Sequence, residues 1–189
     1  MKTLSLSAFI KTWVSSPRVV GAICPSSRGL GRRMASFIPS STKGLVIELG
    51  GGTGVVTSAL LEKGIPQDQI VVVEYSQEMV RVLKKKFPLL TVIQGDASFL
   101  ADLLKKHLGD QHDPVDAVVS SLPLRSLPTT TVEAIMKQLN SLLGEKGQYI
   151  QFTYDLRSNM PCPLKQFSRR DSKIVWFNIP PARVDLFCR

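Results

Sequence analysis

Cysteine is scarce in this sequence, and its distribution excludes several kinds of site. Cys24, Cys162 and Cys188 lie far apart, and none of them belongs to a Cys-x-x-Cys pair or to a Cys/His cluster. Disulfide frameworks need cysteines in even number, and zinc sites need ligands at short, regular spacings. We therefore expect reduced thiols, as in the cytoplasm, and no bound metal.

Long apolar runs are also missing. Hydrophobic residues make up 43% of the 189 positions, but no uninterrupted run approaches the roughly 20 residues that span a bilayer. Lys11 interrupts the weakly apolar stretch near the start, and no small-residue cleavage signal follows it. We expect neither a membrane-spanning helix nor a secretory peptide, and the length suits one globular domain.

Acidic residues are absent from the first 43 positions, which carry seven Lys or Arg. Residues 44–150 are close to neutral, with ten basic and twelve acidic side chains, and the whole chain has a net charge of +9. The charge therefore divides the chain into a basic leader, 1–43, and a body, 44–189. A basic leader indicates an anionic partner, which is either nucleic acid or an acidic membrane surface.

From residue 44 onward, short β-rich runs alternate with helical stretches of about ten residues. This alternation predicts an α/β fold with a Rossmann-like, seven-stranded and mostly parallel sheet. The runs 173–178 and 182–188, joined by a Pro-Pro turn, predict a C-terminal antiparallel hairpin. Gly64 and Gly144 are expected to cap helices. The other expected strands are 45–49, 70–74, 90–93, 115–120 and 148–153, and the expected helices are 54–63, 77–86, 98–108 and 129–143.

A glycine-rich turn, residues 48–54 with the sequence ELGGGTG, ends the first expected strand. Glycines permit a tight turn with close backbone approach, and the helix that follows offers free N–H groups to an anion. A dinucleotide fingerprint needs Gly or Ala where Val55 stands, and a phosphate-binding loop continues with Gly-Lys-Ser/Thr. The turn therefore favours a different ligand, with a carboxylate at this end.

Polar residues end the next strands at the same edge, where ligands bind in open α/β sheets. Glu74 ends the second strand and can accept hydrogen bonds from two ribose hydroxyls, while Tyr75 can lie against an adenine ring. Asp96 and Ala97 follow the third strand, where Asp96 can accept from the adenine amino group or cap the next helix. Ser120 ends the fourth strand.

Together, the turn, Glu74 and Asp96 resemble the first three motifs of class I S-adenosylmethionine-dependent methyltransferases, over about residues 44–189. The resemblance implies S-adenosyl-L-methionine as the cofactor, with its methionine end in the glycine turn, its ribose on Glu74 and its adenine at Asp96. The expected cofactor-binding residues are Glu48, Gly50, Gly52, Gly54, Glu74, Tyr75, Asp96, Ala97 and Ser120.

The fourth strand continues into residues 120–124, SSLPL, which lack two residue types. Base-methylating enzymes typically carry Asn/Asp-Pro-Pro-Tyr/Phe or Asn-Leu-Pro-Tyr here, and the aromatic ring stacks on the base. This chain has neither the Asn or Asp nor the aromatic residue. Because a flipped base is held by stacking and by hydrogen bonds to its edge, nucleic acid is disfavoured as the substrate.

The leader carries a finer resemblance, to the soluble bacterial phospholipid N-methyltransferases. It rests on Phe9-Ile10-x-x-Trp13, Pro17, Val20-Gly21-Ala22-Ile23, Pro25-Ser26-Ser27, Leu30, Ser120-x-Leu122-Pro123 and Asn178-x-Pro180-Pro181-Ala182. At Ser121 that family would have Gly, a departure that affects the shape of the substrate pocket. The resemblance implies methylation of phosphatidylethanolamine and its methylated derivatives to phosphatidylcholine. The residues it implies for the substrate or membrane are Phe9, Trp13, Pro25, Ser26, Ser27, Arg28, Leu122 and Pro123.

Apolar residues recur at helical spacing in the leader. One stripe is Leu6, Phe9, Ile10, Trp13 and Val14, and a second, beside Arg28, Arg32 and Arg33, is Leu30, Met34, Phe37 and Ile38. A basic amphipathic helix can lie in a headgroup layer, with Trp at the interface and cations near anionic lipid. That alternative places a monomer peripherally on the inner face of the cell membrane. In the other alternative, both stripes pack on the domain. The sequence leaves both alternatives open.

Methyl transfer to an amine needs alignment and an unprotonated lone pair. Tyr154 and Asp155 follow the fifth strand at the ligand edge and are the catalytic candidates, and Tyr154 can instead offer its ring face to a methylated ammonium. His107 and His112 precede the fourth strand and are expected on the surface at the opposite edge. Two other functions stay open: an rRNA adenine dimethyltransferase, and an adaptor that binds the cofactor without turnover.

Overall fold

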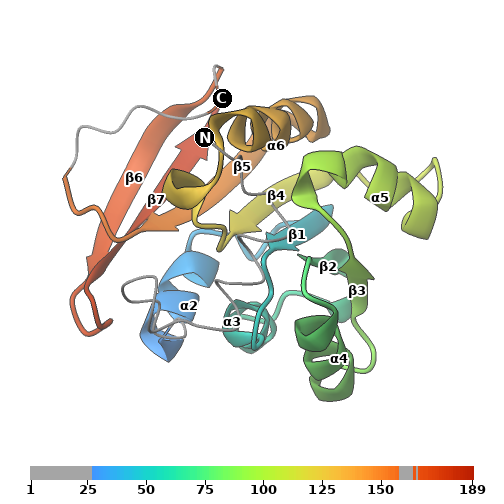
Figure 1. The fold of residues 1–189 in the computed structure, drawn as a ribbon, viewed down its shortest axis with the longest axis horizontal. Coiled ribbons are helices and arrows are strands. Elements are labelled where there is room, and N and C mark those ends of the chain that lie inside the picture. The colour runs from blue at the N-terminus through green and yellow to red at the C-terminus, as the bar shows by residue number, and fades with distance from the viewer. Residues whose placement is uncertain (1–26, 158–163, 165) are drawn as a thin grey trace, which may run out of the picture.

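The computed structural model describes residues 27–157, 164 and 166–189, and these form a seven-stranded sheet with helices on both faces (Figure 1). The strands are β1 (Leu45–Leu49), β2 (Ile70–Glu74), β3 (Thr91–Gln94), β4 (Val115–Ser120), β5 (Leu143–Thr153), β6 (Ser168–Val175) and β7 (Ala182–Cys188). They lie in the order β3-β2-β1-β4-β5-β7-β6. The first five are parallel, and β7 runs antiparallel between β5 and β6. The predicted fold class is confirmed.

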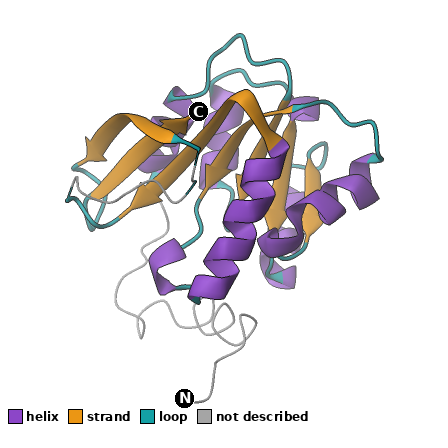
Figure 2. Cartoon of the chain, turned by 90° about the horizontal axis from the view of Figure 1, so that it is seen from above, coloured by secondary structure: helices purple, strands orange, loops and turns teal. Residues whose placement is uncertain are grey.

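Two hydrophobic cores lie on the two faces of this sheet, between it and the helices, whose arrangement on both faces Figure 2 shows in a view turned by 90°. One core lies under α2, α3 and α4, and the other under α5 and α6. The helices are α2 (Arg28–Ser36), α3 (Val55–Glu62), α4 (Gln77–Lys86), α5 (Leu100–Leu108) and α6 (Thr129–Leu142), with 3-10 turns at η1 (Gln67–Gln69), η2 (Ala97–Phe99) and η3 (Leu124–Ser126). Every residue of β1 and β2 is buried, which is why these central strands are continuous apolar runs broken only by Glu48 and Glu74.

The strand register gathers the polar strand ends at one edge. Leu49 pairs with Val73 and with Ser120, and Ser120 pairs with Gln151 on β5. The carboxyl ends of four parallel strands therefore lie side by side, which is where open α/β sheets bind ligands. Because β7 runs the opposite way, its first residues and the turn that precedes them lie at this same edge.

Three element boundaries differ from the prediction. β5 begins at Leu143 because α6 passes directly into it, so Gly144 lies inside the strand and has no positive φ, whereas Gly64 does (φ 90°) and follows α3 as predicted. β6 spans 168–175 and not 173–178. Its charged first half lies outside the predicted strand, but β6 is an edge strand, and edge strands commonly carry charged side chains. The predicted helix 98–108 divides into η2 and α5.

The second apolar stripe packs on the domain. Leu30, Met34, Ala35 and Ile38 are all buried and belong to the core beneath α3. On the outer side of α2, Arg32 Nε donates to Glu62 Oε2 of α3 across 2.9 Å. The last part of the basic leader is therefore built into the fold. The first stripe, which includes Phe9 and Trp13, lies outside the described residues, and so do Pro25 and Ser26.

Candidate cofactor and substrate site

The glycine turn lies between β1 and α3, at the centre of the ligand edge. Gly50, Gly52 and Gly54 all have positive φ, of 77°, 50° and 76°. Gly54 is the N-cap of α3, and a Cβ there would meet the Phe87 ring at 2.4 Å, so only glycine fits. A Cβ on Gly52 would meet nothing within 4 Å, which leaves open space beside the turn. The turn thus combines a helix N-terminus with room for a ligand.

Glu74 joins the end of β2 to the glycine turn. Its Oε2 accepts a hydrogen bond from the Gly52 N–H at 2.9 Å, and its Oε1 accepts from the Ser76 N–H at 2.8 Å. The side chain is 7% exposed. Each carboxylate oxygen has a second lone pair, so the group can still accept from two further donors such as ribose hydroxyls. The backbone bonds hold the carboxylate at the place where such donors would arrive.

Glu48 is buried beneath the same turn. Its Oε2 accepts from the Thr57 hydroxyl of α3 at 2.6 Å, while its Oε1 is buried with no hydrogen-bond partner among the described residues. Burial raises the pKa of the Glu48 carboxyl to about 8, against the hydrogen bonds from Thr57, which lower it. The raised pKa favours the protonated form of this side chain near neutral pH, and a protonated carboxyl can donate a hydrogen bond.

Asp96 lies at the end of β3 and caps η2. Its Oδ1 accepts from the Ser98 N–H at 2.9 Å and from the Ser98 hydroxyl at 2.7 Å, as the capping alternative predicts. Tyr75 is half-buried after β2, and Ala97 is buried beside Asp96. The structure thus brings the strand-end residues predicted for the cofactor to one edge.

The segment after β4 covers the other side of the glycine turn. Ser120 is 1% exposed and its Oγ accepts from the Leu122 N–H at 3.3 Å, while a Cβ on Gly50 would lie 3.2 Å from Leu122 Cδ2. Gln151 of β5 fixes this segment, because its Nε2 donates to the Leu122 carbonyl at 3.1 Å. Gln151 was missed in the sequence analysis, since nothing near it in the sequence marks it as a contact of Leu122.

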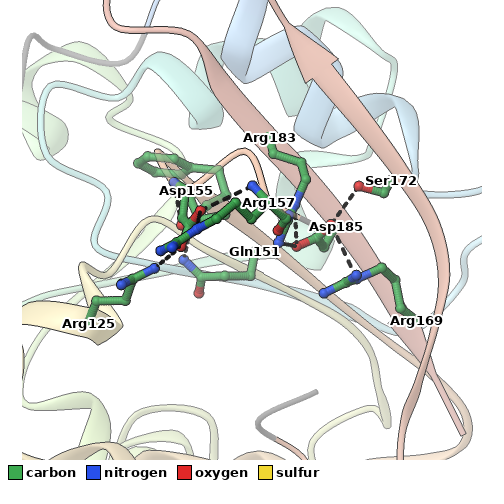
Figure 3. Close-up of polar contacts among 10 residues, drawn as sticks. Arg125, Gln151, Asp155, Arg157, Arg169, Ser172, Arg183 and Asp185 are labelled. Atoms are coloured by element: carbon green, nitrogen blue, oxygen red, sulfur yellow. Dashed lines mark hydrogen bonds and ion pairs between the residues drawn. The ribbon is translucent and has the colours of Figure 1, made fainter. Parts of the chain in front are cut away.

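Asp155 is held by arginines from two directions (Figure 3). Arg157 binds it in bidentate fashion at 2.9 and 2.8 Å, and Arg125 of η3 pairs with its Oδ2. Hydrogen bonds from Arg157, and then from Arg125, hold the pKa of the Asp155 carboxyl well below its usual range. A carboxylate of this kind is a weak proton acceptor. Tyr154, the other catalytic candidate, packs edge-on against Phe152 with ring centroids 5.4 Å apart.

A second cluster of charges anchors the segment that carries Asp155. Arg183 of β7 donates to Asp185 at 3.1 and 2.9 Å and also to the Arg157 carbonyl, and both side chains are at least 95% buried. On β6, the Ser172 hydroxyl donates to Asp185 at 2.7 Å and Arg169 lies 3.4 Å from it (Figure 3). The sequence analysis did not identify this cluster, because Arg and Asp alternating along a strand are typical of a solvated face.

Ser27, predicted for the substrate side, is tied to the β6–β7 turn. Its N–H donates to Asn178 Oδ1 at 3.1 Å, and its Oγ accepts from the Leu30 N–H at 3.1 Å and so caps α2. Arg28 beside it is exposed. His107 and His112 precede β4 at the opposite edge, as predicted. Among residues 27–157, 164 and 166–189, no group of three His, Cys, Asp or Glu side chains could hold a metal ion.

Fold, glycine turn and strand-end carboxylates together define the class: a Rossmann-like methyltransferase that uses S-adenosyl-L-methionine. The chain belongs to the family described as methyltransferase domain, which matches residues 46–147 and thus more than half of its length. The predicted class and cofactor are confirmed. The roles of the individual site residues stay predictions.

Three known proteins show how far the likeness extends. The ornithine lipid N-methyltransferase of Singulisphaera acidiphila is 29% identical over 189 residues, covering 96% of this chain and 94% of that protein. Ribosomal RNA small subunit methyltransferase A of Geobacter sulfurreducens is 29% identical over 114 residues, covering 58% of this chain and 39% of that protein. The crystal structure of TrmN from Thermus thermophilus has a TM-score of 0.67 at 14% identity, covers 94% of this chain and 52% of that one, and bears on the fold alone.

Proposed function

We propose that this methyltransferase acts on the amine of a lipid headgroup, converting phosphatidylethanolamine and its methylated derivatives to phosphatidylcholine. The observation that carries the proposal is the match to a lipid N-methyltransferase along nearly all of both chains. Because 96% of this chain is covered, the match includes most of the basic leader 1–43. The rRNA methyltransferase matches little more than half of the chain.

The segment after β4 favours a lipid amine over a nucleobase as the group that is methylated. Leu124 occupies the position where a base-methylating enzyme offers a stacking ring, and it is half-buried together with Leu122 and Pro123. Stacking on an aromatic side chain is a principal means of holding a base outside its duplex. An alkyl amine has no such requirement and needs only a path to the methyl donor.

The turn and the strand ends fit the cofactor. Glu74, with acceptor capacity left on both oxygens, would hold the ribose, Asp96 the adenine, and the open space at Gly52 the methionine end. When bound there, the cofactor supplies a methyl group on a cationic sulfonium. The protein's part is to align the amine and to take its proton. We assign Tyr154 as the proton acceptor or the ring that faces the methylated ammonium, and Asp155 a positioning role.

An ornithine lipid is a second candidate substrate, favoured by the activity that gives the same relative its name. Ornithine, like ethanolamine, presents a primary amine on a short alkyl chain. The two substrates therefore make the same demand on Tyr154 and on alignment, and differ in the anionic group that lies next to the amine.

We further propose that the enzyme is a monomer that binds peripherally to the inner face of the cell membrane through its basic leader. No helix within the described parts of the chain is long and apolar enough to cross a bilayer. Each basic residue near an anionic surface contributes about 1 kcal/mol, and salt screens this attraction. Sedimentation with vesicles should therefore show binding that requires anionic lipid and falls as salt is raised.

Labelled S-adenosyl-L-methionine tests the substrate directly. The enzyme is incubated with vesicles that contain phosphatidylethanolamine, with vesicles that contain an ornithine lipid, and with ribosomal RNA, and Glu74→Ala is the control for cofactor-dependent labelling. We expect label in phosphatidylethanolamine and its methylated products. Label in the ornithine lipid alone would favour the second candidate, and label in RNA or in no substrate would contradict the proposal.

A deletion of residues 1–20 tests the leader separately. We expect the shortened chain to lose vesicle binding and lipid methylation but to keep a folded core that binds cofactor, since α2 and the core residues below it remain. Normal lipid methylation by the deletion would show that the leader is not the membrane anchor.

A further inference from the structure

Large apolar side chains project from the turn between β6 and β7. Trp176 is 65% exposed, Phe177 is 98% exposed and Ile179 is 79% exposed. They make up half of the exposed large hydrophobic residues in the described chain, within four positions of each other. Figure 1 shows this turn beside the start of α2. Single exposed apolar residues are common on protein surfaces, but a group of this size indicates a surface that meets another apolar phase.

The turn is braced from beneath by a buried asparagine. Asn178 is 2% exposed, its Nδ2 donates to the Pro180 carbonyl at 2.7 Å, and its N–H donates to the Val175 carbonyl at 3.3 Å. Its Oδ1 accepts from the Ser27 N–H at 3.1 Å. These hydrogen bonds satisfy the polar groups of Asn178 within the protein and fix the shape of the turn, so that its apolar side chains are held outward. They also give a structural reason for the Asn178-x-Pro180-Pro181-Ala182 pattern.

The β6–β7 turn lies next to the proposed reaction site. Val175 pairs with Ala182, and Arg183 pairs with Thr153 at the carboxyl end of β5, so residues 176–181 extend past the edge where the cofactor residues and Tyr154 lie. A surface that docks there would approach the reacting centre from the side of the lipid amine.

Basic residues flank the turn, and one of them, Lys173, pairs with Asp171 of the same strand at 3.4 Å. Arg28 is exposed at the start of α2, and a Cβ on its neighbour Gly29 would lie 3.8 Å from Val175 Cγ1. Lys173 is half exposed on β6. Residues 172–184 contain no Asp or Glu. An apolar tip with Trp among its residues and cations behind it matches the interface of an anionic bilayer, where the rings enter the acyl boundary and the cations stay among headgroups.

We propose that the β6–β7 turn, residues 176–181, is a wedge that inserts into the membrane surface and presents the ligand edge to the lipid headgroups. The inference rests on the proposed lipid substrate, and it assigns the insertion to Trp176, Phe177 and Ile179, separately from the basic leader. The leader supplies attraction to the surface, whereas the turn sets the depth and orientation of the active edge.

Trp176 reports on the proposal directly. The chain has two tryptophans, so Trp13→Phe leaves Trp176 as the sole emitter in an otherwise complete protein. Vesicles of phosphatidylethanolamine and phosphatidylglycerol should shift its emission to the blue, and lipids brominated high on the acyl chain should quench it. Unchanged emission in a protein that sediments with the vesicles would overturn the proposal, whether the turn stays in water or is already covered by residues 1–26 or by a partner.

Phe177→Ser tests the consequence for activity, with Leu89→Ser as its matched control. Leu89 is 78% exposed but precedes β3, at the opposite edge of the sheet. Removal of one large inserted side chain should lower vesicle partitioning and methylation in vesicles about 10- to 100-fold and leave methylation of detergent-dispersed lipid unchanged. Leu89→Ser should behave as wild type. Equal loss in both variants, or no loss in either, would contradict the wedge. A wild-type enzyme that labels no lipid would instead contradict the proposed function.

Discussion

Two regions of the molecule hold their carboxylates differently. Around β1 and β2 the carboxylates accept from backbone and hydroxyl donors, whereas around β5 and β7 they form ion pairs with arginines. On the proposed cofactor side, Glu74 accepts from the backbone N–H groups of Gly52 and Ser76, and buried Glu48 accepts from the Thr57 hydroxyl. On the substrate side, Asp155 and Asp185 are each held by two arginines. The same residue type, a carboxylate, thus has different hydrogen-bonding partners in the two halves.

The difference follows from what each half has to do. A carboxylate that accepts hydroxyl hydrogen bonds must keep lone pairs for its ligand, and backbone donors leave them available. A carboxylate bound to arginines spends its acceptor capacity within the protein and instead fixes the chain around it. The carboxylates of the proposed cofactor half therefore keep acceptor capacity for a ligand, whereas the ion pairs of the other half hold residues 155–157 in place.

The largest effect is expected where the substrate half is broken. Asp185→Ala leaves the guanidinium of Arg183, whose side chain is 3% exposed, buried without its partner. Removal of one partner of a buried ion pair costs about 3–5 kcal/mol. The free energy of unfolding, measured in urea, should fall by that amount. Asp171→Ala is the control, because its pair with Lys173 on the same hairpin is exposed and should be worth less than about 1 kcal/mol. Similar losses in both variants would refute the distinction.

A pH-dependent effect is expected next, from the cofactor half. Since burial raises the folded-state pKa of Glu48 from 4.5 to about 8, the folded protein keeps a proton that the unfolded chain releases. The contribution of Glu48 to stability is therefore fully present below about pH 4.5 and is lost as pH rises to about 8, by roughly 1 kcal/mol per pH unit in that window.

Glu48→Gln removes this titration while keeping a neutral side chain of similar shape. Unfolding of both proteins in urea at several pH values isolates the contribution, because all other groups are shared. The stability of the wild type relative to Glu48→Gln should fall between pH 5 and pH 8. Parallel curves over that range would mean that the Glu48 carboxyl is not held protonated by the fold.

Local patterns predicted where the proposed cofactor residues lie, because each of them is within a few residues of a strand end. The glycine turn, Glu74 and Asp96 all follow apolar runs directly, and the period of those runs predicts the strands. The substrate half depends on contacts between distant positions. Asp155 meets Arg125 from 30 residues away, and Ser27 meets Asn178 from 151 residues away. No periodicity links such pairs, so the sequence indicated Asp155 as a catalytic candidate but not the arginines that hold it.

A smaller effect, on binding, is expected at the ribose position. Glu74→Ala removes a charged acceptor of two hydrogen bonds and should weaken binding of S-adenosyl-L-methionine by roughly 1.5–3 kcal/mol. Isothermal titration calorimetry measures the loss. Glu78→Ala, on the exposed first turn of α4, should leave the affinity unchanged. An unchanged affinity in a folded Glu74→Ala protein would remove Glu74 from the cofactor site.

The smallest effect is expected from substitution of Asp155, the ion-paired carboxylate to which we assign a positioning role. If Asp155 were the general base, Asp155→Asn would lower kcat by about 100- to 10,000-fold and remove the acidic limb of its pH profile. We expect a loss of less than tenfold in kcat, because the arginines already make this carboxylate a weak proton acceptor. The pH profile should keep its shape, since the titrating group lies elsewhere. Tyr154→Phe, which removes only the hydroxyl, is measured in parallel. If Asp155→Asn loses more kcat than Tyr154→Phe and its pH profile is flattened, Asp155 is the general base. That result would also show that the ion pairs of Asp155 open in the working enzyme.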